Sequence, residues 1–250
     1  MFDEPADAWR EYWETALERR REQLERAARD PLGAWLVAEA PALVENDVVD
    51  PVALRDDPDA VLAAAHDGFE SLVADGDLPG HDDDRYGYGT LPVHVTAVGR
   101  VDGVEFSLSD PVDGANELRT LRSAAVVDEP TRRHEAGVVT YRCPLGHETS
   151  VRQPLLRTWP VETCPKNDCE QGVVPDDART RARRVARFTV ETDAGTLPCV
   201  ATGRVAAGEA FDRLADVRRL HLTGVVRLLA DASGSLDPTC EVLAAEPASP

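Results

Sequence analysis

The chain has 250 residues, 42% of them hydrophobic, which is enough to bury a core without disulfide or metal staples. Its 27 Lys and Arg residues against 46 Asp and Glu residues give a net charge of −19, which argues against a surface that is basic overall. We expect a soluble cytoplasmic protein with no membrane partner, because the sequence shows neither an apolar run of membrane-spanning length nor a signal peptide.

Lys166 is the only lysine in the chain. A phosphate-binding P-loop needs a lysine after glycine, whereas Lys166 follows Pro165, so we expect no nucleotide ligand of that kind. Abundant Asp and Glu with almost no Lys is typical of proteins from halophilic archaea. Residues 118–187 are the only segment with net positive charge, 13 basic against 9 acidic side chains, and they contain three of the five cysteines. Any site for an anion is therefore expected there.

Residues 1–80 are predicted to form a helical bundle. The first helix has an apolar stripe of Trp9, Trp13, Leu17 and Leu24 and ends near Asp30. A second helix is predicted over 32–43, and a third begins at Asp57 as the cap with Pro58 in its first turn. Residues 75–89, which include Asp82 to Asp84, are interpreted as a solvated linker.

From residue 91 the hydrophobic period changes to two, which indicates strands. Further strands are expected at 124–127, 138–141, 188–191, 200–205, 220–228 and 240–243. Short strands separated by Gly and Pro favour a small barrel over 91–250, with a frayed tail from Ala244 onward.

Cys143 and His147 are separated by sixteen residues from Cys164 and Cys169. Two such pairs, each bent by Pro, Gly or Asn, fit a tetrahedral structural Zn²⁺ site of three thiolates and one imidazole. His134 is an alternative fourth ligand. The other interpretation is that these cysteines are unliganded core thiols, as is expected for Cys199 and Cys240. A zinc deaminase is excluded, because Glu148 directly follows His147 and Thr163 precedes Cys164.

The order of these parts resembles the N-terminal region of the minichromosome maintenance (MCM) helicases. The resemblance rests on weak motifs in matching order, namely 57–62, 116–122 with Val126, Val127, Arg132 and Arg133, 139–143, Leu197 and Pro198, 211–214, Val217, and 220–227 with a Thr-Gly turn. It implies an α+β chain, with a helical bundle followed by a five-stranded OB-fold barrel that carries a zinc subdomain inserted at about 143–177. It also implies ring formation and binding of DNA in the ring channel.

Two departures from that family affect the expected function. The ATPase motor is absent from this sequence, and the segment equivalent to the basic DNA-binding hairpin, 230–238, contains two aspartates and no cation. DNA binding is instead predicted at arginines, which suit phosphates and bases, and at one tryptophan. This predicted set comprises Arg132, Arg133, Arg152, Arg157, Trp159, Arg179, Arg181, Arg183, Arg184 and Arg187. The alternative is that Asp176, Asp177 and other acids neutralise these arginines in surface ion pairs.

We expect a protein that is not an enzyme, because the sequence contains no nucleophile elbow, dinucleotide fingerprint or obvious acid and base pair. The leading hypothesis is an MCM N-terminal-like protein of replication or repair that binds single-stranded or forked DNA, a replication protein, or itself as a ring. One alternative is a single-strand-binding protein similar to replication protein A. Another is an acidic adaptor that binds a protein partner and no DNA.

Overall fold

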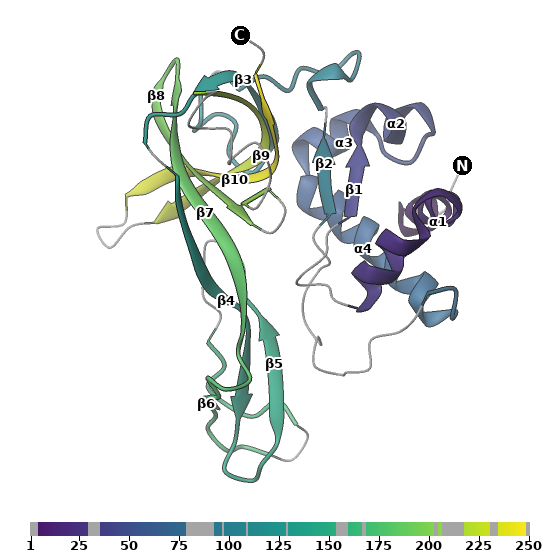
Figure 1. Ribbon diagram of the computed structural model, residues 1–250, viewed down its shortest axis with the longest axis vertical. Coiled ribbons are helices and arrows are strands. Elements are labelled where there is room, and N and C mark those ends of the chain that lie inside the picture. Colours follow the sequence, from purple (N-terminus) through teal and green to yellow (C-terminus); the bar gives the residue numbers. More distant parts are fainter. Residues whose placement is uncertain are drawn as a thin grey trace.

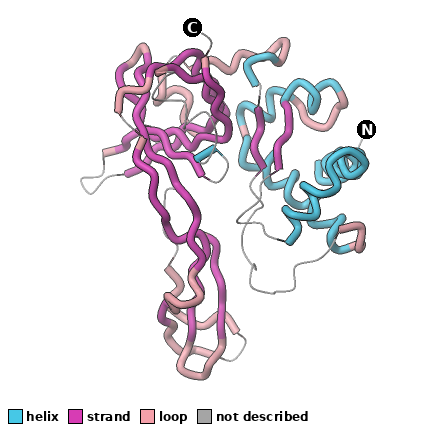
Figure 2. The backbone as a smooth tube through the Cα atoms, in the orientation of Figure 1, coloured by secondary structure: helices cyan, strands magenta, loops and turns pink. Residues whose placement is uncertain are grey.

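The computed structural model describes residues 5–29, 36–78, 93–96, 98–108, 110–128, 130–153, 160–166, 169–202, 205–206, 218–230 and 235–248. Helices gather on one side of the molecule, and a curled sheet with a long projecting ribbon occupies the other (Figures 1 and 2). No helix among these residues is long and apolar enough to cross a membrane. The predicted mixture of a helical N-terminal part and a β-rich remainder is confirmed.

The first predicted helix is confirmed as α1 (Pro5–Arg29), and its four predicted core residues are all buried. It packs on α4 (Pro58–Ala74), where the Trp13 indole N–H donates to the carbonyl oxygen of Ala65 at 2.9 Å. Gly68 permits the close approach of the helices, since a Cβ there would lie 2.7 Å from the Ala6 carbonyl oxygen. The Asp57 cap of α4 is also confirmed, because its carboxylate accepts from the backbone N–H of Ala60.

The second predicted helix, over 32–43, is wrong in its central part. Residues Leu36–Glu39 form strand β1, which pairs in parallel with β2 (Val93–Thr96), and the helix α2 is confined to Ala40–Glu45. The short apolar run 36–38 fits either period, and Leu36 and Ala38 are buried in a strand arrangement. A further helix, α3 (Pro51–Asp56), is capped by the Asp50 carboxylate.

The predicted five-stranded barrel is confirmed. The five barrel strands lie in the order β3, β9, β10, β8, β7 within an eight-stranded sheet, with β10 and β8 parallel and the other pairs antiparallel. The bridge between Val126 and Val190 returns the chain after β3 to β7 and closes the curl. Buried residues from all five strands, among them Leu121, Phe188 and Leu197, fill the interior. The bounds are β3 Leu118–Ala125, β7 Arg181–Thr192, β8 Gly195–Thr202, β9 Arg219–Ala230 and β10 Leu236–Pro247.

Two expectations about β9 and β10 are wrong. Thr223 and Gly224 do not form a turn but lie inside β9, where a Cβ on Gly224 would be 2.6 Å from the carbonyl oxygen of Glu241. Glycine is therefore needed for close strand approach beside the bulge in β10. Residues 244–247 are not frayed, because they continue the pairing of β10 with β9 as far as Pro247.

Apolar and ionic contacts join the helices to the barrel. One buried cluster combines Ala40 and Leu54 from the helical part with Leu118 and Val225 from the barrel. At its edge the Arg227 guanidinium of β9 donates to both carboxylate oxygens of Asp59 in α4, at 2.6 and 2.7 Å. The helical part is thus packed against the barrel through a shared core.

A two-stranded ribbon, formed by β4 (Thr131–Arg142) and the antiparallel β7, extends from the barrel to the lower end of the molecule (Figure 1). There β5 (Glu148–Arg152) and the short β6 (Val174–Pro175) pair with β4. The ribbon separates the predicted zinc ligands at its far end from the barrel core.

Candidate metal centre and nucleic-acid interface

The four predicted ligands, Cys143, His147, Cys164 and Cys169, come together at the far end of the ribbon. Their ligand atoms all lie within 4.8 Å of one another, and the three cysteines are buried. All five cysteines of the chain are free thiols, so no disulfide competes with metal binding. This cluster could hold a metal ion.

Two turns direct these ligands toward one point. In the first, the backbone N–H of Cys143 donates to the carbonyl oxygen of His147 at 3.1 Å, and Gly146 adopts the left-handed region at φ +83°. In the second, the N–H of Cys164 donates to the Gln171 carbonyl oxygen at 2.9 Å. These two turns account for the two ligand pairs that the sequence spacing predicts, Cys143 with His147 and Cys164 with Cys169.

The spacing of the ligand atoms fits a small tetrahedral ion. The Sγ atoms of Cys143 and Cys169 are 4.0 Å apart, and Cys164 Sγ lies 3.7 Å from His147 Nδ1. Bond lengths of about 2.3 Å to sulfur and about 2.0 Å to nitrogen give separations of about 3.8 and about 3.5 Å in a tetrahedron. Three soft thiol donors with one imidazole are a donor set that suits Zn²⁺.

The alternative ligand His134 lies elsewhere. It occupies β4 opposite Arg184, nine residues before Cys143, which corresponds to about 30 Å along a strand. At the cluster itself, burial raises the pKa of the Cys143 thiol, but backbone N–H groups of His147 and Leu145 donate to the sulfur and outweigh it. The pKa of Cys143 therefore lies below its ordinary value, as suits a thiolate ligand.

The predicted DNA-binding arginines divide between the two faces of the ribbon. Cross-strand partners share a face, and Arg132, His134 and Arg184 are exposed on the same one. Arg133, Arg183 and Arg187 lie on the opposite face. Arg184 forms no hydrogen bond or ion pair with the residues that the structure describes. The run of arginines in sequence is therefore not one continuous patch.

Acidic residues engage several of these arginines. Glu135 accepts from Arg133 at 2.7 Å and from Arg187 at 2.9 Å. Burial raises the pKa of Glu135, but the two guanidinium groups together lower it by more than burial raises it. The pKa of Glu135 therefore lies below its ordinary value. Arg183 is half-buried and donates to the Gln153 carbonyl oxygen at 2.6 Å, and burial lowers the pKa of its guanidinium.

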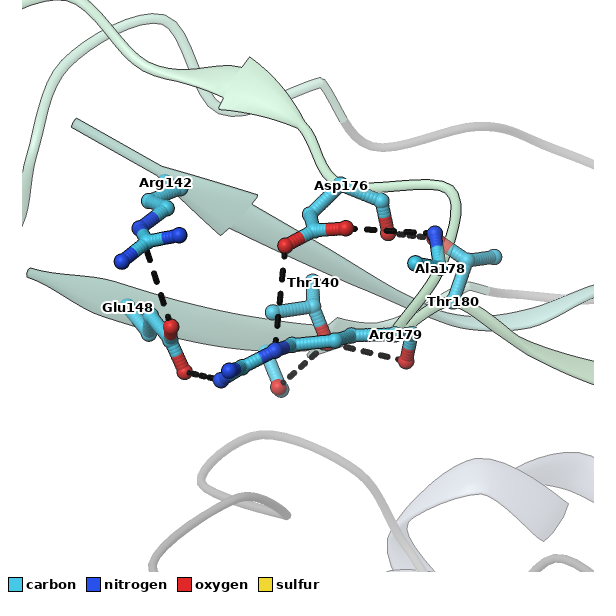
Figure 3. Close-up of polar contacts among 8 residues, drawn as sticks. Thr140, Arg142, Glu148, Asp176, Ala178, Arg179 and Thr180 are labelled. Carbon is cyan, nitrogen blue, oxygen red and sulfur yellow. Dashed lines mark hydrogen bonds and ion pairs between the residues drawn. The ribbon is translucent and has the colours of Figure 1, made fainter. Parts of the chain in front are cut away.

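Arg179 belongs to a network near the end of the ribbon that carries the Cys and His cluster (Figure 3). Its guanidinium pairs with Glu148, which also lies 3.8 Å from Arg142, and with Asp176 at 3.8 Å. The Asp176 backbone N–H donates to the Thr140 carbonyl oxygen at 2.7 Å. Neutralisation of this arginine by Asp176, one of the two alternatives from sequence, is thus observed.

The remaining predicted DNA-binding residues are located only by their strand position or lie outside the described residues. Arg181 is exposed on β7 opposite Val138, and the backbone of Arg152 ends β5. Arg157 and Trp159 lie outside the described residues, as do Asp82 to Asp84 and residues 231–234 of the segment 230–238. The aromatic side chains of Tyr141 and Phe188 are buried, so they do not form a stacking surface.

No protein-family model and no curated protein matches the sequence. Among solved structures, the crystal structure of the N-terminal domain of an archaeal MCM, determined at 1.8 Å, matches with a TM-score of 0.68. The alignment covers 97% of both chains at 10% sequence identity.

The chain folds like an MCM N-terminal domain. The resemblance deduced from motif order is therefore confirmed at the level of fold, including the helical part, the barrel and the inserted end that carries the Cys and His cluster.

The sequence alternative of surface ion pairs named Asp176 and Asp177, but it did not identify Glu135 or Glu148 as partners of the arginines. Glu135 and Glu148 lie on β4 and β5 beside the predicted binding residues, and they attach three of them to the protein itself. Because successive side chains of a strand point to opposite faces, the sequence alone could have placed Arg184 on the opposite face from Arg183 and Arg187. The register pairs Glu135 with Arg183, and Arg187 reaches Glu135 diagonally from further along β7, a contact that the sequence of one strand does not predict.

Proposed function

We propose that this protein is a non-catalytic MCM N-terminal-like protein that binds single-stranded or forked DNA during replication or repair. The observation that carries the proposal is the match of fold over nearly the whole chain, with the cluster and the arginine-bearing ribbon in one continuous structure. The functional domains are proposed as 1–80, a helical bundle, and 91–250, an OB-fold with the zinc subdomain at 143–177. Ring formation by copies of the chain belongs to the same proposal.

Zn²⁺ is proposed as the structural ion of the Cys143, His147, Cys164 and Cys169 cluster. Four protein ligands fill a tetrahedral shell, which leaves no position for a reactive water. The ion would cross-link two turns that otherwise share a small buried cluster with little apolar area beyond Val173. Its contribution is to the folding of this end of the ribbon.

The DNA contact is assigned to the ribbon face of Arg132, His134 and Arg184. Arg184 is exposed and has no acidic partner among the described residues, whereas Arg133, Arg179 and Arg187 are engaged by carboxylates. An arginine without an internal carboxylate can donate its full fork to a phosphate. The face with the free guanidinium is therefore favoured over the whole arginine run.

Fluorescence anisotropy with a labelled oligothymidylate at two salt concentrations tests this proposal. Replacing both Arg132 and Arg184 by glutamine removes two cations, so the slope of log affinity against log salt concentration should decrease by about 1.4. The control is Arg21→Gln on α1, which removes one exposed charge far from the ribbon in sequence. Equal affinity and slope in the double variant and the wild type would refute this assignment.

The adaptor alternative is favoured by the ion pairs themselves. Arg133, Arg179 and Arg187 are held by Glu135, Glu148 and Asp176, which reduces the positive charge available to DNA. If the wild type does not bind the oligonucleotide at low salt but does bind a replication protein, the result supports the adaptor function and contradicts DNA binding. A ring-sized species on gel filtration would favour the MCM-like protein over the alternative of a single-strand-binding protein similar to replication protein A.

A further inference from the structure

A groove of about 440 Å³ opens on the outer surface of the barrel, and none of its described lining residues belongs to the ribbon strand β4. Its walls come from β3, β9, β10 and the short 3₁₀ turn η2 (Val98–Arg100). Two cross-strand partners, Thr120 and Thr223, lie side by side within it. Its size falls in the range of sites for small molecules.

The charge in this groove is opposite to that of the chain. Arg100, Arg122 and His221 line it, and Glu246 is the one acidic residue among its described lining. The chain as a whole carries −19. Arg100 is exposed and makes no hydrogen bond or ion pair with the part of the chain that the structure describes. Two arginines beside a single carboxylate in the described lining, in a chain this acidic, mark the groove as a site for an anion.

Arg122 is held in position at the groove edge. Its Nη2 donates to the carbonyl oxygen of Gly99 at 2.8 Å, and a Cβ on Gly99 would lie 3.2 Å from that nitrogen. One nitrogen of the guanidinium is thus fixed to η2. The donors of the fork that this bond does not use remain for a ligand.

His221 is oriented by a strained backbone position. Ser123 adopts a left-handed conformation at φ +53° where the register between β3 and β9 shifts. Its backbone N–H donates to His221 Nδ1 at 3.2 Å, and Arg219 donates to its carbonyl oxygen at 3.0 Å. Because Nδ1 accepts, the imidazole proton resides on Nε2, which is left as a donor. Strain at a non-glycine residue is a feature of binding sites.

We infer that this groove binds a phosphate group through Arg100, Arg122 and His221. Guanidinium and imidazole N–H donors suit the tetrahedral oxygens of phosphate, which accepts several charge-assisted hydrogen bonds. Glu246, opposite His221 across β9 and β10, limits the affinity by repulsion. The phosphate belongs either to free inorganic phosphate or to a phosphate ester, such as the backbone of a nucleic acid.

Titration with inorganic pyrophosphate, followed by the amide NMR signals of Ser123 and Thr223, tests the inference without DNA. Saturable shifts are expected in the wild type. Arg100→Gln and Arg122→Gln should each weaken binding about tenfold. Glu246→Gln should strengthen binding, and Arg21→Gln, the control on α1, should leave it unchanged. Arg100→Gln is informative even if Arg122→Gln perturbs the fold.

Competition identifies the source of the phosphate. Displacement of pyrophosphate by a thymidine dinucleotide assigns a phosphate ester, and displacement by inorganic phosphate alone assigns the free ion. The inference is overturned if no saturable shift occurs, or if Arg100→Gln and Glu246→Gln bind pyrophosphate as the wild type does. Neither result depends on the ribbon, so a failure here is distinct from a failure of oligonucleotide binding.

Discussion

Replacing Arg227 by glutamine is expected to weaken the attachment of helix α4 to the barrel. Arg227 donates to both oxygens of Asp59, and its Nε lies 3.3 Å from a carboxylate oxygen of Glu241. The Arg227 side chain is 21% exposed and that of Asp59 is 63% exposed. The pair is therefore neither fully screened nor fully desolvated.

This geometry sets the expected magnitude. An exposed ion pair contributes up to about 1 kcal/mol, and a bidentate guanidinium lies near the upper end. Loss of the second contact leaves Glu241 without its cation, so the free energy of unfolding should fall by about 2 kcal/mol in total. For a chain of this size that corresponds to a decrease in Tm of about 4–8 °C.

A double-mutant cycle with Asp59→Asn and Arg227→Gln isolates the pair. Urea unfolding of the four zinc-loaded proteins should give a coupling free energy of about 1 kcal/mol. Arg21→Gln is the matched control, since its contact with Glu25 is 3.7 Å long and exposed, and it should cost less than about 0.5 kcal/mol. A coupling energy near zero would refute the interpretation that this pair joins the two parts.

Three further predictions concern single positions. Gly224→Ala should lower the free energy of unfolding by about 1–3 kcal/mol in urea titrations, because the new methyl would lie 2.7 Å from Cys240 Sγ. Gly146→Ala should cost about 1 kcal/mol through backbone strain alone, since nothing lies within 4 Å of its Cβ position; an unchanged Tm would contradict this. The folded-state pKa of Glu135 is depressed, so its stabilisation is present above the unfolded value of about 4.3 and is lost as pH falls through the folded value. Glu135→Gln should therefore lose less stability than the wild type between neutral and acid pH, measured by thermal melting at a series of pH values.

Sequence periodicity was sufficient for the helices α1 and α4 and for the strand character of the barrel. Trp9 and Trp13 lie on one face of a long helix, and the cap at Asp57 is a local signal. The run at 36–38 was predicted as helix because three apolar residues do not distinguish the hydrophobic period of a helix from that of a strand. Its partner strand β2 lies more than fifty residues away in the chain. Gly224 was misread because its requirement comes from β10, which follows it in the chain.

The candidate sites also differ in how far the sequence predicts them. Spacing within two turns was enough to bring Cys143, His147, Cys164 and Cys169 together. The arginines could not be sorted from the sequence, because whether each meets phosphate or carboxylate depends on cross-strand register. The basic groove was not foreseen, since Arg100, Arg122 and His221 come from three separate elements.

Metal content of the purified, folded protein tests the central claim most directly. Elemental analysis should find about one zinc ion per chain in the wild type, and Cys164→Ser should lose it together with the folded signals of the ribbon end. Folded protein that contains no zinc, with its thiols fully reduced, would contradict the assignment of this cluster as a structural metal centre.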